Sequence, residues 1–474
     1  MEGRVIIVGG GLAGLSAAAM LTQHGLTVTL LESRPRLGGR AGSFLDTTTN
    51  EWIDTCQHVG MGCCTNLLHF LKLVGVDDLF REERELTFIG PGGERCRFGD
   101  HIGPAPLHLA GAFRRLSYLS IGEKWRLGQD LSRLAHPHWA DVHDLSFDDW
   151  LSRHAQSSDC RDRFWDVILV SALSERAARI SVPAARNVFV DGFMSNRVGW
   201  RVYLPTAPLD EIYGQRLTAW LMSHGADVRT QAGVQRLEEQ NGEVVAARLR
   251  SGEVIAADEF VLAVPWHRVR DLVPSSLVDH PVVTAADQIE AAPISSVHLW
   301  FGRPVLDVPH AVLVGRLGQW VFTRAQSLNP QPSTLSSNLH YLQVVISASH
   351  ELAAKPQAEV VAAVVTELGE IWPEANGASL VHGRVVTEHR AVFSPQPGVE
   401  KLRPAQQSPM ANLQLAGDWT QTGWPATMEG AVRSGYLAAE NILRRMGRDA
   451  SLVQAELPTS WLAQRLFGLR DKRP

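Results

Sequence analysis

The residues Arg4-Val5-Ile6-Ile7-Val8-Gly9-Gly10-Gly11-Leu12-Ala13-Gly14 decide the fold of this chain. The first five form a short, mostly β-branched apolar run, which is typical of a buried parallel strand. The glycines follow at once with the spacing of a turn between a strand and a helix. Gly9 permits the tight turn, Gly11 lets the backbone approach a pyrophosphate, and Gly14 lets the helix pack on the strand. The pattern predicts the first unit of a Rossmann-type nucleotide-binding domain.

The residues after the glycines complete this unit. A helix is expected from Leu12 to Gly25, with its positive N-terminal end directed at the phosphates. A second strand, expected from Leu26 to Leu31, ends in Glu32. An acid about 20 residues past the glycines accepts hydrogen bonds from ribose hydroxyls. Glu32 therefore favours a nucleotide with a free 2′-hydroxyl over one with a 2′-phosphate.

A basic loop follows, Arg34-Pro35-Arg36-Leu37-Gly38-Gly39-Arg40. Its paired glycines allow a close approach of the backbone to a ligand, and Arg40 can neutralise a phosphate. A solvated basic loop is the alternative reading. The position of the arginines directly after a complete βαβ unit favours the phosphate role.

A second informative stretch, Leu415 to Gly435, lies near the other end of the chain. It has the pattern of a strand ending in Gly417-Asp418, a turn, and a helix start. Asp418 can accept hydrogen bonds from a ribityl chain or from water bound to the pyrophosphate. The backbone around Met428, at the head of the helix, can donate to a flavin carbonyl and stabilise negative charge on a reduced ring. Together with the N-terminal motif, this stretch predicts FAD as the cofactor.

Composition limits the function classes. The chain has 474 residues, 45% of them hydrophobic, and a formal net charge of −5. These values suit a globular protein of two or three lobes and argue against nucleic acid as the main partner. No apolar run approaches the 18 or so residues of a spanning helix. The five cysteines are sparse, and Cys63 and Cys64 lack metal-ligand spacing, so we expect no metal site and a reducing, cytoplasmic location.

The order of the expected elements predicts an α/β fold with a discontinuous Rossmann-type domain. We expect an FAD-binding domain from residues 1–75, 204–275 and 396–447. A mainly helical lobe is expected at 76–203, a substrate domain with a mixed sheet at 276–395, and an amphipathic C-terminal tail at 448–474.

The motifs quoted above resemble those of the amine oxidase and phytoene desaturase superfamily of FAD enzymes. Two blocks, Asn50–Leu67 and Gly417–Gly430, are similar to the hydroxysqualene dehydroxylases, the squalene-associated branch of that superfamily. The resemblance extends over nearly the whole chain. It implies FAD contacts from Gly9, Gly11, Leu12, Ala13, Gly14, Glu32, Arg40, Val234, Gly417, Asp418 and Met428, with Val234 holding the adenine by its backbone. One departure is Cys56, which stands where many members of the superfamily have glycine, so the flavin-facing loop is expected to differ in shape.

The resemblance also implies a reaction. Hydroxysqualene and reduced FAD would give squalene, water and oxidised FAD, with a hydride from the flavin quenching the allylic cation left by the hydroxyl. Such a reaction needs a general acid. His58 is the first candidate, with Asp54 as its partner or as an alternative acid, while a role for His58 in ordering the loop is the alternative. Arg433 could support the flavin ring or form a plain salt bridge.

Two competing enzyme classes are open. A carotenoid- or squalene-type desaturase would run the hydride transfer from substrate to FAD, and an amine oxidase is less favoured because no aromatic cage can be placed. A non-catalytic FAD-stabilised scaffold is the remaining alternative. No second nucleotide motif is evident for a nicotinamide reductant, so the electron donor and the oligomeric state stay open.

Because a C30 isoprenoid is insoluble in water, we expect such a substrate to enter the enzyme from a membrane surface. Pro106–Leu119 is apolar with a basic pair, and Trp461–Arg470 is short, basic and amphipathic. Helices of this kind lie in the interface of a bilayer, although each segment could equally pack on its own domain. We therefore expect a cytoplasmic protein associated peripherally with the inner face of the membrane.

Overall fold

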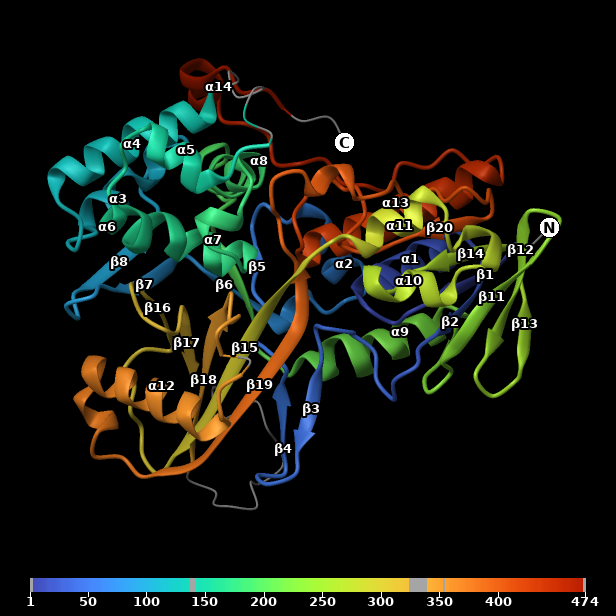
Figure 1. Cartoon of the computed structure of the whole chain (residues 1–474), viewed down its shortest axis with the longest axis horizontal. Coiled ribbons are helices and arrows are strands. Elements are labelled where there is room, and N and C mark those ends of the chain that lie inside the picture. Colours follow the sequence, from blue (N-terminus) through green and yellow to red (C-terminus); the bar gives the residue numbers. More distant parts are fainter. Residues whose placement is uncertain (1–2, 137–141, 143, 324–338, 353, 472–474) are drawn as a thin grey trace.

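The computed structural model describes residues 3–136, 142, 144–323, 339–352 and 354–471. Short parts of the expected domains (1–2, 137–141, 143, 324–338, 353 and 472–474) lie outside the described residues. Figure 1 shows a nucleotide-binding half that contains the N-terminus, and a second half in which a helical lobe lies beside a mixed sheet. The predicted α/β fold is confirmed.

A sheet of five strands in the order β10-β2-β1-β14-β20 forms the centre of the nucleotide-binding half. Its strands are β1 (Arg4–Val8), β2 (Thr27–Leu31), β10 (Asp227–Arg229), β14 (Glu259–Leu262) and β20 (Leu413–Leu415). All four pairings are parallel. Val5 and Ile7 face one hydrophobic core while Ile6 and Val8 face another, so both faces of the sheet are covered.

Helices α1 (Leu12–Gln23) and α13 (Met428–Arg445) pack against each other beside this sheet. The Ser16 hydroxyl donates to the carbonyl of Val432 at 3.3 Å. A Cβ on Gly435 would overlap the carbonyl oxygen of Ala13, so the two backbones meet where only glycine fits. Helices α2 (Thr65–Leu73) and α9 (Leu217–Ser223) complete the same core.

The other face of the sheet is covered by an antiparallel sheet of three strands and two helices. The strands are β11 (Val234–Gln240), β12 (Glu243–Leu249) and β13 (Val254–Ala256), and the helices are α10 (Trp266–Leu272) and α11 (Pro281–Asp287). Their buried residues join those of β1 and β14 in one core.

A mixed sheet of seven strands has the order β19-β15-β18-β17-β16-β7-β8. Its strands are β7 (Glu85–Ile89), β8 (Arg95–Gly99), β15 (Ala291–Phe301), β16 (His310–Leu313), β17 (Trp320–Thr323), β18 (His340–Ser347) and β19 (Leu380–Phe393). Helix α12 (Gln357–Ile371) packs on one face through Val360, Val364 and Leu368. The hairpin β7–β8 belongs to this sheet and not to the helical lobe, so the expected division between 76–203 and 276–395 does not hold there. The pairing of β7 with β16 is non-local, and hairpin periodicity carries no information about it.

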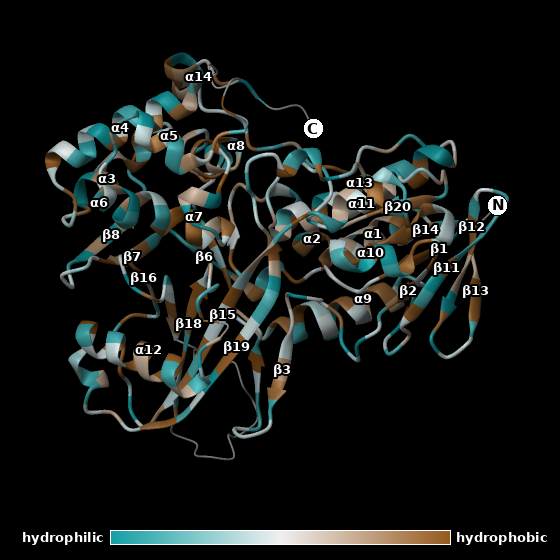
Figure 2. Ribbon diagram, in the orientation of Figure 1, coloured by the Kyte–Doolittle hydropathy of each residue, from teal (hydrophilic) through white to brown (hydrophobic). Residues whose placement is uncertain are grey.

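The helical lobe contains α3 (Ala110–Arg115), α4 (Ile121–Ala135), α5 (Phe147–Arg153), α6 (Ser158–Cys160), α7 (Asp166–Leu173) and α8 (Val182–Arg186). Two π-helical segments interrupt it, η4 (Arg161–Trp165) and η6 (Asn187–Met194). Two small sheets complete the fold: β3 (Ser43–Asp46) with β4 (Glu51–Asp54), and β5 (Gly60–Met61) with β9 (Val202–Pro205) and β6 (Phe80–Glu83). Figure 2 shows hydrophobic stretches on the strands between this lobe and α12, so an apolar interior lies between the two.

The C-terminal tail lies on the helical lobe. Helix α14 (Trp461–Phe467) buries Ala463 and Phe467 in the core of that lobe. The Ser460 hydroxyl donates to the carbonyl of Ala105 at 2.7 Å. Within the described residues, no helix combines the length and the apolar character needed to cross a membrane.

Candidate functional site

The glycine-rich turn between β1 and α1 lines a large cavity. Gly9 has a φ of +110°, and a Cβ there would overlap the carbonyl of Ala263. Gly11 has no atom within 4 Å of an added Cβ, so its backbone borders open space. Leu12 and Ala13 also line the cavity at the first turn of α1, where backbone N–H groups have no helical partner. This turn has the open, positive end that a pyrophosphate requires.

Glu32 also lines the cavity and is held in place by backbone donors. Its carboxylate accepts hydrogen bonds from the amides of Gly10 at 2.8 Å and Arg34 at 2.7 Å. Val234, the first residue of β11, lies on the wall of the same cavity. These two residues border the part of the cavity where the nucleotide end of a dinucleotide is expected.

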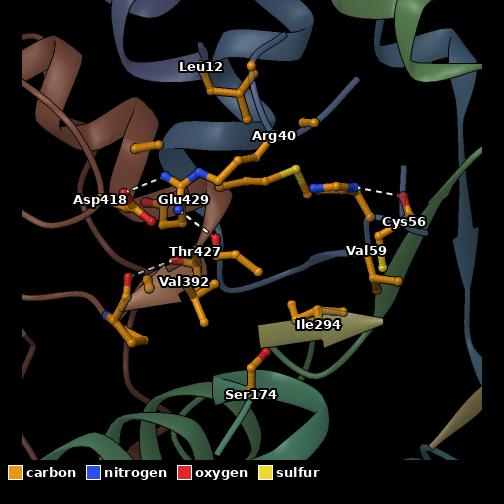
Figure 3. A pocket seen from close by; sticks show the side chains of 18 of the residues that line it. Leu12, Arg40, Cys56, Val59, Ser174, Ile294, Val392, Asp418, Thr427 and Glu429 are labelled. Carbon is orange, nitrogen blue, oxygen red and sulfur yellow. Dashed lines mark hydrogen bonds and ion pairs between the residues drawn. The ribbon is translucent and has the colours of Figure 1, made fainter. Parts of the chain in front are cut away.

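Arg40 and Asp418 join the two ends of the chain. The Arg40 guanidinium donates to the Asp418 carboxylate and to the carbonyl of Ala391, each at 2.6 Å (Figure 3). Burial lowers the pKa of Arg40, but the adjacent Asp418 charge outweighs burial and leaves that pKa raised. About a third of the Arg40 side chain (31%) is exposed, against 4% for Asp418. The proposed phosphate and ribityl contacts must therefore be made beside this ion pair.

Gly417 and Met428 bracket the loop that leads into α13. The amide of Gly417 donates to the Ser434 hydroxyl at 2.8 Å, and Thr427 caps the helix by accepting from the amide of Gly430 at 3.1 Å. The carboxylate of Glu429 accepts from the amides of Asn66 and Leu67, so it caps α2 from 363 residues away along the chain. The N-cap residue of α2 is Cys64, whose own side chain makes no capping hydrogen bond.

Arg403 is a buried residue that sequence reasoning missed. Its guanidinium donates to the carbonyl oxygens of Asp418 at 3.1 Å, Thr420 at 2.5 Å and Trp424 at 2.8 Å. It also lies over the ring of Phe393, 4.8 Å from the centroid. Arg403 thus fixes the loop after Gly417-Asp418. A single arginine in a loop carries no sequence signal for such a role.

His58 lies in the wall of the cavity, but Asp54 does not orient it. Nδ1 of His58 is 2.9 Å from the carbonyl of Cys56, so this nitrogen carries the proton. The Asp54 carboxylate accepts instead from the Ser43 hydroxyl at 2.6 Å and the Leu209 amide at 3.0 Å. The proposed pairing of the two was wrong because β4 turns Asp54 toward β3 and the start of η7 (Asp210–Arg216). Burial lowers the pKa of His58, and the charge of Arg40 acts in the same direction.

Arg433 does not line the cavity. Its guanidinium forms an ion pair with Glu456 of the C-terminal tail at 3.1 Å, and its side chain is buried. The salt-bridge alternative describes Arg433 correctly, and a catalytic contact with a flavin ring is not supported by this position.

Beyond the loop at Thr427, the cavity continues as an apolar chamber. The whole cavity has a volume of about 780 Å³. In Figure 3, Val59, Ile294 and Ser174 border the space across from Arg40, Asp418 and Glu429. The chamber wall combines residues of the helical lobe and of the seven-stranded sheet: Leu86, Phe88, Phe98, Val167, Ile168, Leu173, Val188, Phe193, Trp200, Ile294, Val312, Trp320, Phe322 and Val345. A polar groove for a dinucleotide therefore opens into a hydrophobic compartment.

A family model, flavin containing amine oxidoreductase, matches residues 12–443. The chain belongs to this family. Its cofactor is FAD, and the residues present fit it, because the glycine turn leaves open space at Gly11 while Glu32 and Asp418 lie along the same cavity. When bound, the flavin of FAD exchanges a hydride with a substrate carbon. The chain is thus an FAD-dependent oxidoreductase.

Carotenoid desaturases are among the relatives of the chain. The 15-cis-phytoene desaturase of Solanum lycopersicum is 26% identical over 462 residues, covering 93% of this chain and 77% of the relative. The 15-cis-phytoene desaturase of Synechococcus elongatus is 26% identical over 472 residues, and the match covers 93% of this chain and 96% of the relative. The zeta-carotene desaturase of Zea mays is 26% identical over 469 residues, covering 91% and 82%.

Solved structures of similar shape include amine oxidases. Cyclohexylamine oxidase from Brevibacterium oxydans superposes with a TM-score of 0.70 at 17% identity, covering 94% of this chain and all (100%) of the other. Putrescine oxidase bound to putrescine superposes with a TM-score of 0.69 at 18% identity, covering 94% and 100%. At this identity the likeness concerns the fold alone.

Proposed function

We propose that this protein is an FAD-dependent oxidoreductase of a long isoprenoid hydrocarbon. The apolar chamber beside the flavin end of the cavity carries this proposal. A hydrocarbon chain held there would be kept from water, as hydride transfer at a carbon centre requires. The carotenoid desaturases among the relatives support the same substrate class.

Within this class, we favour reductive removal of the hydroxyl of hydroxysqualene to give squalene. The support is the similarity of Asn50–Leu67 and Gly417–Gly430 to the squalene-associated branch. In this reaction the chain would bind the C30 substrate, exclude water and supply a proton to the leaving oxygen. The reacting carbon would be held beside the loop that Arg403 fixes.

Desaturation of a carotenoid- or squalene-type hydrocarbon is the second candidate, and the state of His58 favours it. With its pKa lowered and the Nδ1 proton bonded to Cys56, His58 is neutral at pH 7 and offers a lone pair at Nε2. A neutral imidazole suits the acceptance of a proton better than its donation. The carotenoid desaturases among the relatives support the same reaction.

Anaerobic incubation separates the two reactions. Photoreduced enzyme mixed with hydroxysqualene should be reoxidised while squalene forms, if dehydroxylation is the reaction. Oxidised enzyme mixed with phytoene or squalene should instead be reduced if desaturation is the reaction. Purified protein should be yellow in both cases, and no change of flavin redox state with any of these hydrocarbons would contradict the proposed substrate class.

We also propose that a surface of the helical lobe binds a membrane from which the substrate enters. Four large apolar side chains are mostly exposed there: Ile102 (97%), Ile121 (88%), Trp125 (72%) and Trp461 (65%). The exposed bases Arg114, Arg115 and Arg126 belong to the same region. We call these seven residues the basic apolar surface.

Two contacts tie α4 to the segments before and after it in this lobe. The amine of Lys124 on α4 donates to the carbonyl of Arg114 at 2.8 Å. The ring of His136, just after α4, contacts that of Phe467 on α14 with centroids 5.8 Å apart. Exposed tryptophan and isoleucine beside arginine suit the headgroup region of an anionic bilayer.

Sedimentation with vesicles tests this surface. The protein should bind vesicles of phosphatidylcholine with about one third phosphatidylglycerol. Ile121→Asp with Trp125→Asp should weaken that binding about tenfold or more, because two buried apolar side chains are each worth about 1.5–3 kcal/mol. Met222→Asp on α9 is the matched control, since Met222 is 60% exposed in the other half of the molecule. Equal loss in both variants would contradict a specific surface.

A further inference from the structure

A second pocket, with several charged and polar side chains in its wall, shares residues with the chamber. It has a volume of about 410 Å³ and lies under the C-terminal tail, with Arg186, Ser195, Glu456 and Thr459 in its wall. We call it the tail pocket. Three residues, Cys63, Asp191 and Trp424, line both this pocket and the main cavity. These three residues therefore lie between the two cavities.

Asp191 is the one acidic residue, among the described residues, that lines both cavities. The other carboxylates along the main cavity line that cavity alone. Glu32 is bonded to the amides of Gly10 and Arg34, Asp418 to Arg40, and Glu429 to the N-terminal amides of α2. Glu388 lies on β19, the strand that supplies the Ala391 carbonyl to Arg40.

The π-helical segment η6, which carries Asp191, is hydrogen-bonded to the loop that precedes α13 and, just after its end, to the C-terminal tail. The Asn187 side chain, at the start of η6, donates to the carbonyl of Gly423 at 3.3 Å. After the end of η6, the Ser460 amide donates to the carbonyl of Ser195 at 2.8 Å. The π-helical spacing directs Asn187, Val188, Asp191 and Gly192 toward the chamber. It also places Arg186 3.9 Å from the Asp191 carboxylate. Single π-helical turns are frequent at functional sites.

We propose that Asp191 is the residue that exchanges a proton with the substrate and that the tail pocket is its route to solvent. This inference rests on the proposed oxidoreductase function. In the dehydroxylation, the C–O bond breaks and the Asp191 carboxyl gives its proton to the departing oxygen, which leaves as water. When bound and reduced, FAD would supply the hydride to the carbon, and the Asp191 carboxylate would regain a proton from solvent through the tail pocket.

The position of Asp191 supplies what His58 lacks. The Nδ1 proton of the half-buried His58 is bonded to the carbonyl of Cys56. Asp191 borders the chamber on one side and the tail pocket on the other, so its carboxyl can be reprotonated without admitting water to the chamber.

Substitution with chemical rescue tests the proposal. Asp191→Ala in the FAD-loaded enzyme should lower kcat about 100-fold or more, with little change in KM, because general acid catalysis contributes roughly 10²–10⁴-fold. Added formate should restore part of the rate, since a small carboxylic acid can enter through the tail pocket. Thr459→Leu, which narrows only the tail pocket, should abolish that rescue when combined with Asp191→Ala.

Controls keep the outcomes distinct. Asp162→Asn changes an exposed aspartate on η4, in the same lobe but outside both cavities, and should leave kcat unchanged. FAD content and the substrate-induced change in the flavin absorption band should be those of the wild type in every variant. If Asp191→Ala does not bind FAD, two other variants replace it. Asp191→Glu compares kcat with that of the wild type, and Asp191→Gly compares kcat with and without formate.

An active wild type with an unaffected Asp191→Ala, or with no formate rescue, would overturn the role of Asp191 alone. A wild type that neither dehydroxylates hydroxysqualene nor desaturates phytoene or squalene would overturn the proposed function together with this inference.

Discussion

Single residues at this site are held in place by ion pairs and hydrogen bonds to residues far away in the sequence. Arg40 pairs with Asp418, and Glu429 caps a helix that begins at Thr65. Each interaction satisfies a buried charge that would otherwise be costly. The sequence identified Arg40 and Asp418 as cofactor residues, but it did not predict that they would bind each other.

Arg403 offers a prediction at the residue scale. Arg403→Met should lose about 3 kcal/mol or more of stability, because it removes charge-assisted hydrogen bonds and leaves buried carbonyl groups unpaired. The variant should also release FAD more readily, measured as flavin fluorescence in a filtrate. Arg444→Met, on the exposed side of α13, is the matched control and should retain its FAD. Full flavin retention by Arg403→Met would show that the loop after Asp418 does not need this support.

His108 gives a prediction about pH. It is fully buried, and burial lowers its pKa to about 4. Nearby Asp100 opposes this shift while Arg197 adds to it. The unfolded chain, with a histidine pKa of about 6.5, binds the proton more tightly, so stability falls as the pH drops from about 6.5 toward 4.

At pH 5 this difference amounts to about 2 kcal/mol. His108→Leu should therefore lose less of its free energy of unfolding between pH 7.5 and pH 5 than the wild type does, as measured by urea titration. His101→Leu, at an exposed neighbouring position, should behave as the wild type. Identical pH profiles for His108→Leu and the wild type would rule out this effect.

At the scale of elements, the crossing of α1 and α13 brings the two halves of the cofactor site together. The crossing depends on Gly435, where an added Cβ would overlap the carbonyl oxygen of Ala13. The sequence motifs predicted both helices. They did not predict their contact, because residues 13 and 435 are far apart in the chain.

Gly435→Val should prevent this crossing. The added atoms would push the helices apart, and overpacking of this kind costs about 1–3 kcal/mol or more. The variant should appear with little FAD and a lower Tm. Gly128→Ala on α4 is the control, since it also fills a helical glycine but should raise the stability instead of lowering it. No atom lies within 4 Å of its added Cβ, so it should gain up to about 1 kcal/mol from helix propensity.

At the scale of the whole molecule, the FAD cavity is lined by residues from several separate stretches of the chain. Gly11, Val234, Ile294 and Met428 come from four separate stretches and face one space. A ligand in this space therefore links elements that pack into different cores.

Removal of FAD should consequently destabilise both halves of the molecule together. Free FAD at about 1,000 times its Kd should stabilise the folded protein by about 4 kcal/mol relative to the apoprotein. Thermal unfolding followed by tryptophan fluorescence and by circular dichroism should show one coincident transition with FAD. Two separate transitions that FAD does not merge would contradict such coupling.

The sequence by itself determined the nucleotide-binding unit and the cofactor. The turn glycines, the strand and the acid lie close together in the sequence. The conformation they need is set by local sterics and does not depend on the packing of distant segments. The tertiary structure alone decided that β7–β8 joins the seven-stranded sheet, that Arg403 fixes the loop after Gly417-Asp418, and that Asp191 lies between two cavities. Those facts depend on contacts between residues far apart in the chain, and no local pattern encodes them because many packings satisfy the same periodicity.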